Sequence, residues 1–417
     1  MSATKQRVLV IGTGWAGYEL AQEIDLTKYE LTVVSPETTQ ALTPLLASAA
    51  CGLFAPYLAY EPIRRKSRKV RFLQAYVDSI DFDARAATCR PAFAKLSDQR
   101  FTLEYDKVII APGCQTNTFD TPGVAEHAFF VKSVADARAV RQRLEDMLEI
   151  ASLPGVSEER QRELCHVIIV GGGPTGVEMA AELSDLFIEE FSHLYSNLRG
   201  KMRVSVHDVA DNILCSFDAK LQEYATKSLS AHRVEVKADS HITKVTEDTI
   251  ETKEDGKIGY GMLIWATGNK SISLVGNLKV KKTDGGLTRI LTDEHLHVLR
   301  NGHADPNAFA LGDAADVEGQ SLPTIAQVAL QKAVYLVRVL NSPSTKPEPF
   351  RYKQKAAITY TGAKDGVVAG KDDYSGYGAW LSWRSANVMW TRSFRRKLMI
   401  SITWVLNYFG GRDVARN

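Results

Sequence analysis

The chain has 417 residues, of which 45% are hydrophobic and 24% charged, and its formal net charge is +2. This length can bury the cores of two or three domains, and so small a net charge gives no overall field that would attract nucleic acid. The five cysteines include no CxxC or CxxxxC pair, which argues against a closely spaced redox disulfide and favours reduced thiols.

The first apolar strand begins at Val8, so we expect no signal or transit peptide within this sequence. A membrane-spanning helix needs roughly 18 consecutive apolar residues. The longest apolar run near the C-terminus, Leu398–Phe409, is shorter and is interrupted by polar residues. We therefore expect no membrane span.

Residues 7–35 predict a strand, a glycine turn, a helix and a second strand. The turn, Gly12-Thr13-Gly14-Trp15-Ala16-Gly17, directly follows the apolar run Val8–Ile11. Such a strand-to-helix turn lets backbone amides approach a pyrophosphate, and the helix N-terminus adds partial positive charge. The sequence therefore predicts a dinucleotide site at this turn.

Short strand-like segments follow between residues 70 and 110, and the last of them ends on Ala111-Pro112-Gly113. A helix is expected over Val134–Ile150. The polar connector Ser152–Glu163 after it marks the expected first domain boundary.

The second half repeats this plan. Gly171-Gly172-Gly173-Pro174-Thr175-Gly176 follows the apolar run Val167–Val170, and a long helix is expected from about Thr175 past Leu194. A strand at Val204–Val206 follows, and Met262–Trp265 ends on Ala266-Thr267-Gly268. Two such turns imply two dinucleotides, most simply a flavin and a nicotinamide that exchange a hydride. One nucleotide-binding domain inserted into another accounts for the order.

The residue at the end of the second strand distinguishes the two turns. In the first half it is Ser35, whereas in the second half it is Asp208. A carboxylate there accepts hydrogen bonds from ribose hydroxyls and repels a 2′-phosphate, which favours NADH over NADPH. The alternative is that Asp208 is a solvated loop acid.

From about residue 290 the chain returns to the first domain with a strand at Phe309–Leu311, a turn at Gly312-Asp313 and a helix over Thr324–Leu340. Asp313 could accept a hydrogen bond from a ribityl hydroxyl, or act as a helix N-cap. Gln327 and Gln331 lie four residues apart on one helical face, where their amides could donate to a carbonyl substrate or face solvent.

The C-terminal region combines aromatic and basic residues at helical spacing. Its members are Trp380, Trp383, Trp390, Trp404, Tyr408 and Phe409 with Arg384, Arg392, Arg395, Arg396, Lys397 and Arg412. This pattern suits an amphipathic helix at a membrane interface, with attraction to anionic lipid. A dimer interface or a nucleic-acid patch are the alternatives.

These motifs, taken together, resemble the type II (single-subunit, non-proton-pumping) NADH:quinone oxidoreductases, above all their mitochondrial branch. The pieces that carry the resemblance are the segments 33–36, 42–46, 61–64, 117–124, 171–178, 263–269, 312–313 and 326–331, together with the tail at 383–384 and 409–413. They extend over nearly the whole chain. The chain departs from the family pattern at Leu42, Ile325 and Ala356, which bears on the quinone preference.

The resemblance implies an α/β fold with two Rossmann-like dinucleotide-binding domains, like that of glutathione reductase, plus a C-terminal membrane-docking region. The expected domains are an FAD-binding domain at 1–160 and 285–350, an NADH-binding domain at 161–284, and a membrane-associating or dimerisation region at 351–417.

The resemblance also assigns the site residues, with FAD and NADH as cofactors and no metal. FAD would be held by Gly12, Gly14, Trp15, Gly17, Ser35, Thr43, Leu45, Ala111, Gly113, Gly312, Asp313, Ala326 and Gln327. NADH would be held by Gly171, Gly173, Gly176, Glu178, Asp208, Thr267 and Gly268. The residues expected at the reaction are Glu178, Gln327, Gln331 and Lys355. For Glu178, the alternative is a role in the helix dipole alone.

The implied enzyme oxidises NADH through FAD and reduces a ubiquinone-like membrane quinone by two electrons without proton pumping. We expect a peripheral protein of the mitochondrial inner membrane, a homodimer, with no nucleic-acid partner. One rival is a flavoprotein like apoptosis-inducing factor that reduces quinones outside respiration. The other is a nucleotide-dependent binding or signalling protein without turnover. Sulfide:quinone oxidoreductase is disfavoured, because no cysteine pair flanks the flavin segments.

Overall fold

The computed structural model describes residues 5–65, 68–342 and 347–414. The contacts within the chain divide it into two compact units. Unit 1 comprises residues 1–40, 62–115 and 269–354, and unit 2 comprises residues 41–61, 116–268 and 355–417. Each unit is therefore built from three separate segments of the sequence.

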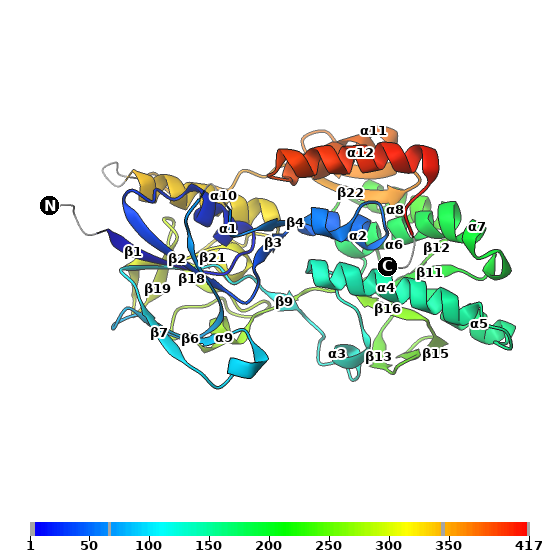
Figure 1. Ribbon diagram of the computed structural model, residues 1–417, viewed down its shortest axis with the longest axis horizontal. Helices are drawn as coiled ribbons and strands as arrows, with labels where there is room; N and C mark the ends of the chain where they lie inside the picture. The colour runs from blue at the N-terminus through cyan, green and yellow to red at the C-terminus, as the bar shows by residue number, and fades with distance from the viewer. Residues whose placement is uncertain (1–4, 66–67, 343–346, 415–417) are drawn as a thin grey trace. The chain divides into compact units, whose positions relative to one another are not determined.

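Unit 1 is organised around a ten-stranded sheet in the order β21-β18-β19-β20-β8-β1-β2-β5-β6-β7 (Figure 1). The neighbours from β20 to β5 run parallel. Antiparallel pairs extend the sheet on both sides, and the edge strand β21 pairs with β18 in parallel. The strands are β1 Gln6–Ile11, β2 Tyr29–Ser35, β5 Arg71–Asp81, β6 Ala86–Pro91, β7 Phe101–Glu104, β8 Lys107–Ile110, β18 Ile290–Thr292, β19 His297–Arg300, β20 His303–Ala310 and β21 Ala315–Val317. The helices are α1 Trp15–Glu23, η3 Ala94–Leu96, α9 Ser273–Asn277, η6 Gly312–Ala314 and α10 Ala326–Asn341.

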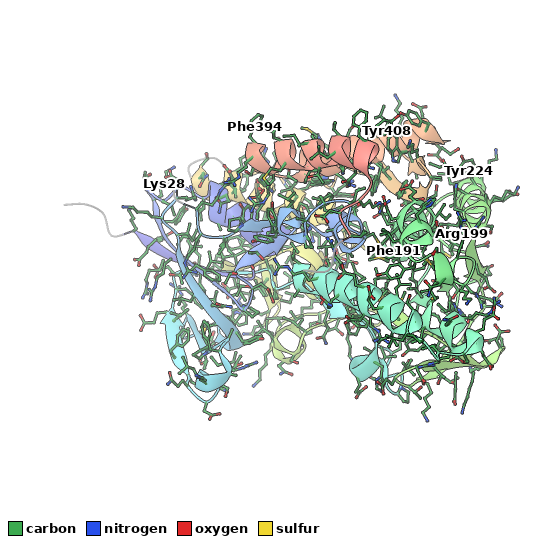
Figure 2. All side chains as sticks on the ribbon, turned by 45° about the vertical axis from the view of Figure 1, so that its right-hand side comes forward. Lys28, Phe191, Arg199, Tyr224, Phe394 and Tyr408 are labelled. Atoms are coloured by element: carbon green, nitrogen blue, oxygen red, sulfur yellow. The ribbon has the colours of Figure 1, made fainter. Side chains whose placement is uncertain are left out.

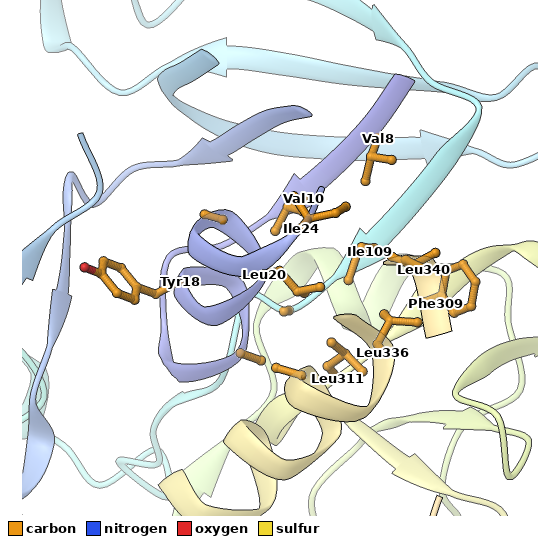
Figure 3. Close-up of a cluster of buried hydrophobic side chains, with 14 of the residues drawn as sticks. Val8, Val10, Tyr18, Leu20, Ile24, Ile109, Phe309, Leu311, Leu336 and Leu340 are labelled. Carbon is orange, nitrogen blue, oxygen red and sulfur yellow. The ribbon is translucent and has the colours of Figure 1, made fainter. Parts of the chain in front are cut away.

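One core cluster of unit 1 fills the space between one face of this sheet and the helices α1 and α10, which pack against each other. A second cluster contains the alternate residues of the same strands, together with Leu274 and Val275 of α9. Figure 3 shows Val8 and Val10 of β1, Leu20 of α1, and Leu336 of α10 within the first cluster. The order strand, turn and helix around Gly12 places the N-terminus of α1 at the carboxyl end of β1, where open parallel sheets bind ligands. The elements predicted for residues 7–35 are confirmed within one or two residues.

Unit 2 contains a four-stranded parallel sheet in the order β12-β11-β10-β16 and an antiparallel sheet of β13, β14 and β15. All five residues of β10 are buried, as expected for a central parallel strand. The strands are β10 His166–Val170, β11 Arg203–His207, β12 Val234–Lys237, β13 Ile242–Val245, β14 Thr249–Thr252, β15 Gly256–Gly259 and β16 Met262–Trp265. The helices are η1 Thr43–Leu45, α2 Leu46–Ala50, η2 Pro56–Ala59, α3 Val124–His127, α4 Val134–Ala151, α5 Glu158–Leu164, α6 Pro174–Leu186, α7 Ser192–Leu194, η5 Ser196–Leu198 and α8 Ala219–Ala231.

The C-terminal part of unit 2 is a three-stranded antiparallel sheet followed by two helices. The sheet consists of β22 Ala357–Gly362, β23 Asp365–Ala369 and β24 Tyr374–Ser375, and the helices are α11 Tyr377–Trp390 and α12 Phe394–Gly410. Figure 1 shows α11 and α12 side by side. Among the described residues, no helix combines the length and apolarity needed to cross a bilayer.

Short strands lie at the limits between the units: β3 Thr39–Ala41, β4 Tyr60–Pro62, β9 Gln115–Thr116 and β17 Asn269–Lys270. These limits differ from the expected boundaries at residues 160 and 285, because residues 116–160 group with the second glycine turn and residues 269–284 with the first. The segment Ser152–Glu163, expected as a connector, contains most of α5. The long helix expected from Thr175 is α6, followed by a π-helical turn at Phe187–Phe191 and then α7.

Candidate functional site: two dinucleotide turns

The first turn has two glycines that the fold itself requires. Gly12 has φ +102°, and a Cβ there would lie 2.3 Å from the Ala111 carbonyl oxygen. A Cβ at Gly17 would lie 2.0 Å from the carbonyl oxygen of Gly12. Gly14, the N-cap of α1, is different, because a Cβ there would meet no atom within 4 Å. Its missing side chain therefore leaves the helix N-terminus open, which fits the pyrophosphate of a dinucleotide.

The second turn repeats this division of roles. A Cβ at Gly171 (φ +110°) would lie 2.5 Å from the Ala266 oxygen, and one at Gly176 would lie 1.9 Å from the Gly171 oxygen. A Cβ at Gly173, the N-cap of α6, would meet nothing within 4 Å. The backbone around both turns thus fits a pyrophosphate equally well.

The residues at the ends of the second strands are held in different ways. The hydroxyls of Ser35 and Thr13 lie 3.0 Å apart in unit 1. In unit 2 the carboxylate of Asp208 accepts hydrogen bonds from the backbone amides of Gly172 and Ala210. Asp208 therefore lies directly beside the second turn, in the position predicted for a ribose contact.

The predicted flavin turn in unit 1 lies between β20 and β21. Gly312 has φ +67°, a backbone conformation that glycine adopts without strain. The thiol of Cys114 is 3.4 Å from an Asp313 carboxylate oxygen, which places the segment after Ala111 and Gly113 beside this turn. These assigned residues therefore meet in one place, as a shared role toward FAD requires.

Helix α10 carries both glutamines of the predicted quinone side. Ala326 and Gln327 lie in its first turn. The amide of Gln331 is engaged at both ends: its nitrogen donates to the Lys353 carbonyl at 2.9 Å, and its oxygen accepts from the Lys353 amide at 3.0 Å. Gln331 therefore fixes the backbone of residue 353, and its direct contact with a quinone stays a prediction.

Other assigned residues are placed as follows. Trp15 begins α1 and packs, partly buried, against the core of unit 1. Thr43 begins η1 and Leu45 is fully buried in unit 2. In unit 2 the Thr267 hydroxyl donates to the Asn117 carbonyl at 2.7 Å, and the Gly268 carbonyl accepts from the Asn117 amide at 2.8 Å. The roles of Lys355 and of these residues toward ligands stay predictions.

Glu178 lies in α6, two residues after the last glycine of the second turn, and its environment is apolar. The Trp383 indole donates to its carboxyl at 2.9 Å. Burial raises the pKa of Glu178 to about 8, although hydrogen bonds from Trp383 and the Tyr360 backbone oppose this shift. The group can therefore change its protonation state near neutral pH.

Sequence reasoning missed the buried charges that continue from Glu178 along α6. Arg412 forms an ion pair with Glu182 at 3.1 Å, and Ser48 donates to the same carboxylate at 2.7 Å. The Tyr360 hydroxyl donates to Asp185, whose pKa is raised to about 6 by burial. Glu178, Glu182 and Asp185 lie at positions i, i+4 and i+7 of an otherwise apolar helix, and this spacing could have indicated buried acidic side chains on one helical face. Arg412, the partner of Glu182, lies 230 residues further along the chain, and no local pattern in the sequence identifies it as that partner.

The comparisons with known proteins agree with this geometry. The family model described as pyridine nucleotide-disulphide oxidoreductase matches residues 6–333. A probable NADH dehydrogenase of Dictyostelium discoideum is 33% identical over 98% of this chain and 91% of its own length. A mitochondrial internal alternative NAD(P)H-ubiquinone oxidoreductase A1 of Solanum tuberosum is 32% identical over 100% of this chain and 89% of its own length.

Among solved structures, that of NDH2 from Plasmodium falciparum in complex with NADH matches with a TM-score of 0.90. It is 23% identical and covers 99% of this chain and 100% of its own. The fold and its two open turns define a flavoprotein of the two-dinucleotide class, and the expected fold class is confirmed. The chain belongs to the pyridine nucleotide-disulphide oxidoreductase family and, within it, to the type II NADH dehydrogenases.

Proposed function

We propose that this protein is an enzyme that oxidises NADH through FAD and reduces a ubiquinone-like quinone by two electrons, without pumping protons. One observation carries the proposal: a single chain holds two glycine turns, each with an open glycine, Gly14 or Gly173, at the N-cap of the following helix. Family membership supports it, as do the relatives named as NADH and NAD(P)H-ubiquinone oxidoreductases. The proposed domains remain an FAD-binding domain at 1–160 and 285–350, an NADH-binding domain at 161–284 and a membrane-associating or dimerisation region at 351–417.

The residues of unit 1 bind and orient FAD, which when bound accepts a hydride and passes on its electrons. The amides of the first turn hold the pyrophosphate, and Ser35 and Asp313 hold hydroxyl groups. In unit 2 the second turn holds the NADH pyrophosphate, and Asp208 accepts from the ribose hydroxyls. Glu178, two residues beyond the turn, is the residue that we assign to the nicotinamide end of NADH.

On the quinone side, Gln327 lies at the N-terminal end of helix α10, where its side-chain amide can donate to a quinone carbonyl. Gln331 acts by fixing the backbone at Lys353, because both ends of its amide are engaged there. Lys355, two residues further on, adds a positive charge to a segment that already contains Lys353.

The α12 helix is the surface that we propose to dock on a membrane. An exposed apolar stripe runs along one of its faces at spacings of three and four residues: Phe394, Leu398, Ile402, Val405 and Phe409. Figure 2 shows Phe394 and Tyr408 on opposite ends of the helix. Exposed apolar stripes of this kind enter the interface of a bilayer. We propose that a second copy in a homodimer shares the same face. The relatives named as mitochondrial support a mitochondrial membrane, and the inner membrane is our proposal.

Liposome co-sedimentation tests the docking surface. Phe394→Ser combined with Phe409→Ser should reduce the bound fraction several-fold. The matched control is Phe93→Ser, an exposed aromatic side chain in unit 1. Equal binding of all three proteins would remove α12 from the membrane contact. Light scattering of the same variants then reports whether the stripe also joins two copies.

The decisive experiment for the activity is anaerobic. Protein loaded with FAD should lose its visible absorbance on addition of NADH and regain it on addition of a short-chain ubiquinone. Protein that binds FAD but is not bleached would be a nucleotide-dependent binding protein without turnover. Bleaching without reoxidation by quinone would keep the flavin–nicotinamide pair and remove the quinone from the reaction.

A further inference from the structure

Unit 1 contains a lysine that is fully buried and that none of the assigned roles uses. Lys332 lies on α10, five residues after Gln327, and its relative exposure is 0%. Its ammonium donates to the Ala315 carbonyl at 3.0 Å. Buried lysines without a carboxylate of their own are rare, because removing an ammonium from water is unfavourable. Such a group is therefore a candidate for a specific electrostatic role.

The nearby carboxylate in β21 is already committed to another cation. Arg289 donates to Asp316 at 2.7 Å and to the same Ala315 carbonyl at 2.8 Å. The side chains of Lys332 and Arg289 thus both donate to the Ala315 carbonyl oxygen, and of the two only Arg289 is hydrogen-bonded to the Asp316 carboxylate. Asp313 in η6 is the next carboxylate that acts on the Lys332 ammonium. Helix α1, which also packs against α10, carries the buried Glu19.

The position of this ammonium relates it to the flavin. Ala315 directly follows Gly312–Ala314, the turn assigned to FAD, and Lys332 shares its helix with Gln327, assigned to the same site. The lysine therefore lies behind two segments that we propose to contact the cofactor. Within a protein interior a unit charge acts over several ångströms with little screening.

We propose that the buried ammonium of Lys332 sets the reduction potential of bound FAD and takes up a proton when the cofactor is reduced. The proposal rests on the proposed function. In the reaction, NADH gives a hydride to FAD and leaves as NAD⁺, so the reduced cofactor carries one additional negative charge. A positive Lys332 stabilises that charge. Where the Lys332 amine is neutral, one proton from solvent binds to its Nζ as the charge appears.

The electrostatics of the site place this proton uptake in an accessible pH range. Burial, together with the nearby charge of Arg289, lowers the pKa of Lys332 to about 8, although Asp316 and Asp313 oppose the shift. A new negative charge on the cofactor raises the same pKa, because it favours the ammonium form. Below about pH 8 the lysine is charged in both redox states. Just above it, reduction binds one extra proton, so the potential falls more steeply with pH.

The test is spectroelectrochemical titration of the full-length FAD-loaded protein from about pH 6 to about pH 10. The wild type should show a break, with one additional proton bound per two electrons above it. Lys332→Met should have a lower potential at neutral pH and no break. Methionine fits a buried site of this size, and the Ala315 carbonyl keeps Arg289 as its donor. The matched control is Lys281→Met, an exposed lysine of the same unit, which should behave as the wild type.

A constant slope in the wild type over the whole range would overturn the proposal, whether or not Lys332→Met folds. An unchanged potential in an FAD-loaded Lys332→Met protein would overturn it as well. Both results leave the proposed function standing if NADH still bleaches the wild type. Failure of that bleaching would instead contradict the proposed function itself.

Discussion

The two units have nearly the same glycine-turn backbone but differ in the charged side chains that their neighbouring helices bury. In both, the first and last glycines are required because a side chain would collide with a carbonyl oxygen, and the N-cap glycine, Gly14 or Gly173, is open. In unit 1, helix α10 carries the buried ammonium of Lys332, which is bound to Ala315 directly after the Gly312 turn. In unit 2, helix α6, which follows the second glycine turn, carries the carboxyl groups of Glu178, Glu182 and Asp185. The cradle for a pyrophosphate is thus a property of the backbone, and what distinguishes the two sites comes from side chains on the neighbouring helices.

The signs of these charges match the two proposed cofactors. FAD gains negative charge when it is reduced, and a cation behind its turn favours that state. A nicotinamide becomes positive when it is oxidised, and an acidic side chain near it favours that state once ionised. The same scaffold therefore supports electron flow from one ring to the other, with the driving force tuned by a few buried groups.

The largest expected effect comes from removing Arg412, the cation that pairs with the buried carboxylate of Glu182 in unit 2. Arg412→Met should lower the free energy of unfolding by about 3–5 kcal/mol, because Glu182 would stay buried without its partner. Urea unfolding measures the change. Arg395→Met, an exposed arginine on the adjoining α12, should change stability by less than about 0.5 kcal/mol.

Unit 1 should respond in the opposite way to the loss of its own buried cation. Lys332 donates its hydrogen bond to a backbone carbonyl, so its removal leaves no buried carboxylate without a partner. Lys332→Met should therefore leave the free energy of unfolding unchanged or raise it. If Lys332→Met and Arg412→Met were destabilised equally, each buried cation would be equally important for the stability of the fold, and the expected difference between the two units would be wrong.

A second prediction separates the glycines of one turn. Gly176→Ala places a Cβ 1.9 Å from the Gly171 oxygen and should reduce stability by about 1–3 kcal/mol. Gly173→Ala meets no protein atom, so it should leave the melting temperature unchanged and weaken NADH binding instead. Thermal unfolding and titration of NADH fluorescence measure the two effects. Weakened stability in Gly173→Ala would show that its site is not open.

Local patterns made most of the fold predictable. The strand, turn and helix around Gly12 and Gly171 were identified because each depends on a few neighbouring residues and on apolar periodicity. The division into units was not predicted, because residues 41–61 and 116–160 join unit 2 through contacts between distant segments. Asp208 and Asp313 could be located from their strand ends. Lys332 could not, because its spacing is that of an ordinary helix and only packing shows its burial.

A third prediction concerns coenzyme choice at the ends of the second strands. Asp208→Asn keeps an acceptor for the Ala210 amide but removes the negative charge beside the second turn. The ratio of kcat/KM for NADPH to that for NADH should rise about tenfold, which corresponds to roughly 1.4 kcal/mol. Asp211→Asn, an exposed acid three residues away, should leave the ratio unchanged. A ratio that stays constant in both variants would remove Asp208 from the ribose contact.

The smallest expected effect tests the protonation state of Glu178. Its pKa is raised in the folded protein, so folding favours the protonated form. This contribution to stability is fully present below the unfolded pKa, near 4.5, and is lost as the pH rises through about 8. Glu178→Gln keeps an acceptor for Trp383 and cannot ionise. Its free energy of unfolding relative to wild type should therefore increase between about pH 5 and about pH 9, by an amount on the order of 1 kcal/mol, as urea unfolding at each pH would measure.

Asp185, whose pKa is also raised, titrates in both proteins and so does not affect the difference. The matched control is Glu223→Gln, an exposed acid whose pKa is lowered by Lys227, and which should show no such increase. A difference between wild type and Glu178→Gln that does not change with pH would mean that Glu178 is ionised throughout. In that case Glu178 would carry a negative charge at every pH tested. It would then differ from Lys332 in the sign of its charge and would not act as a group that titrates near neutral pH.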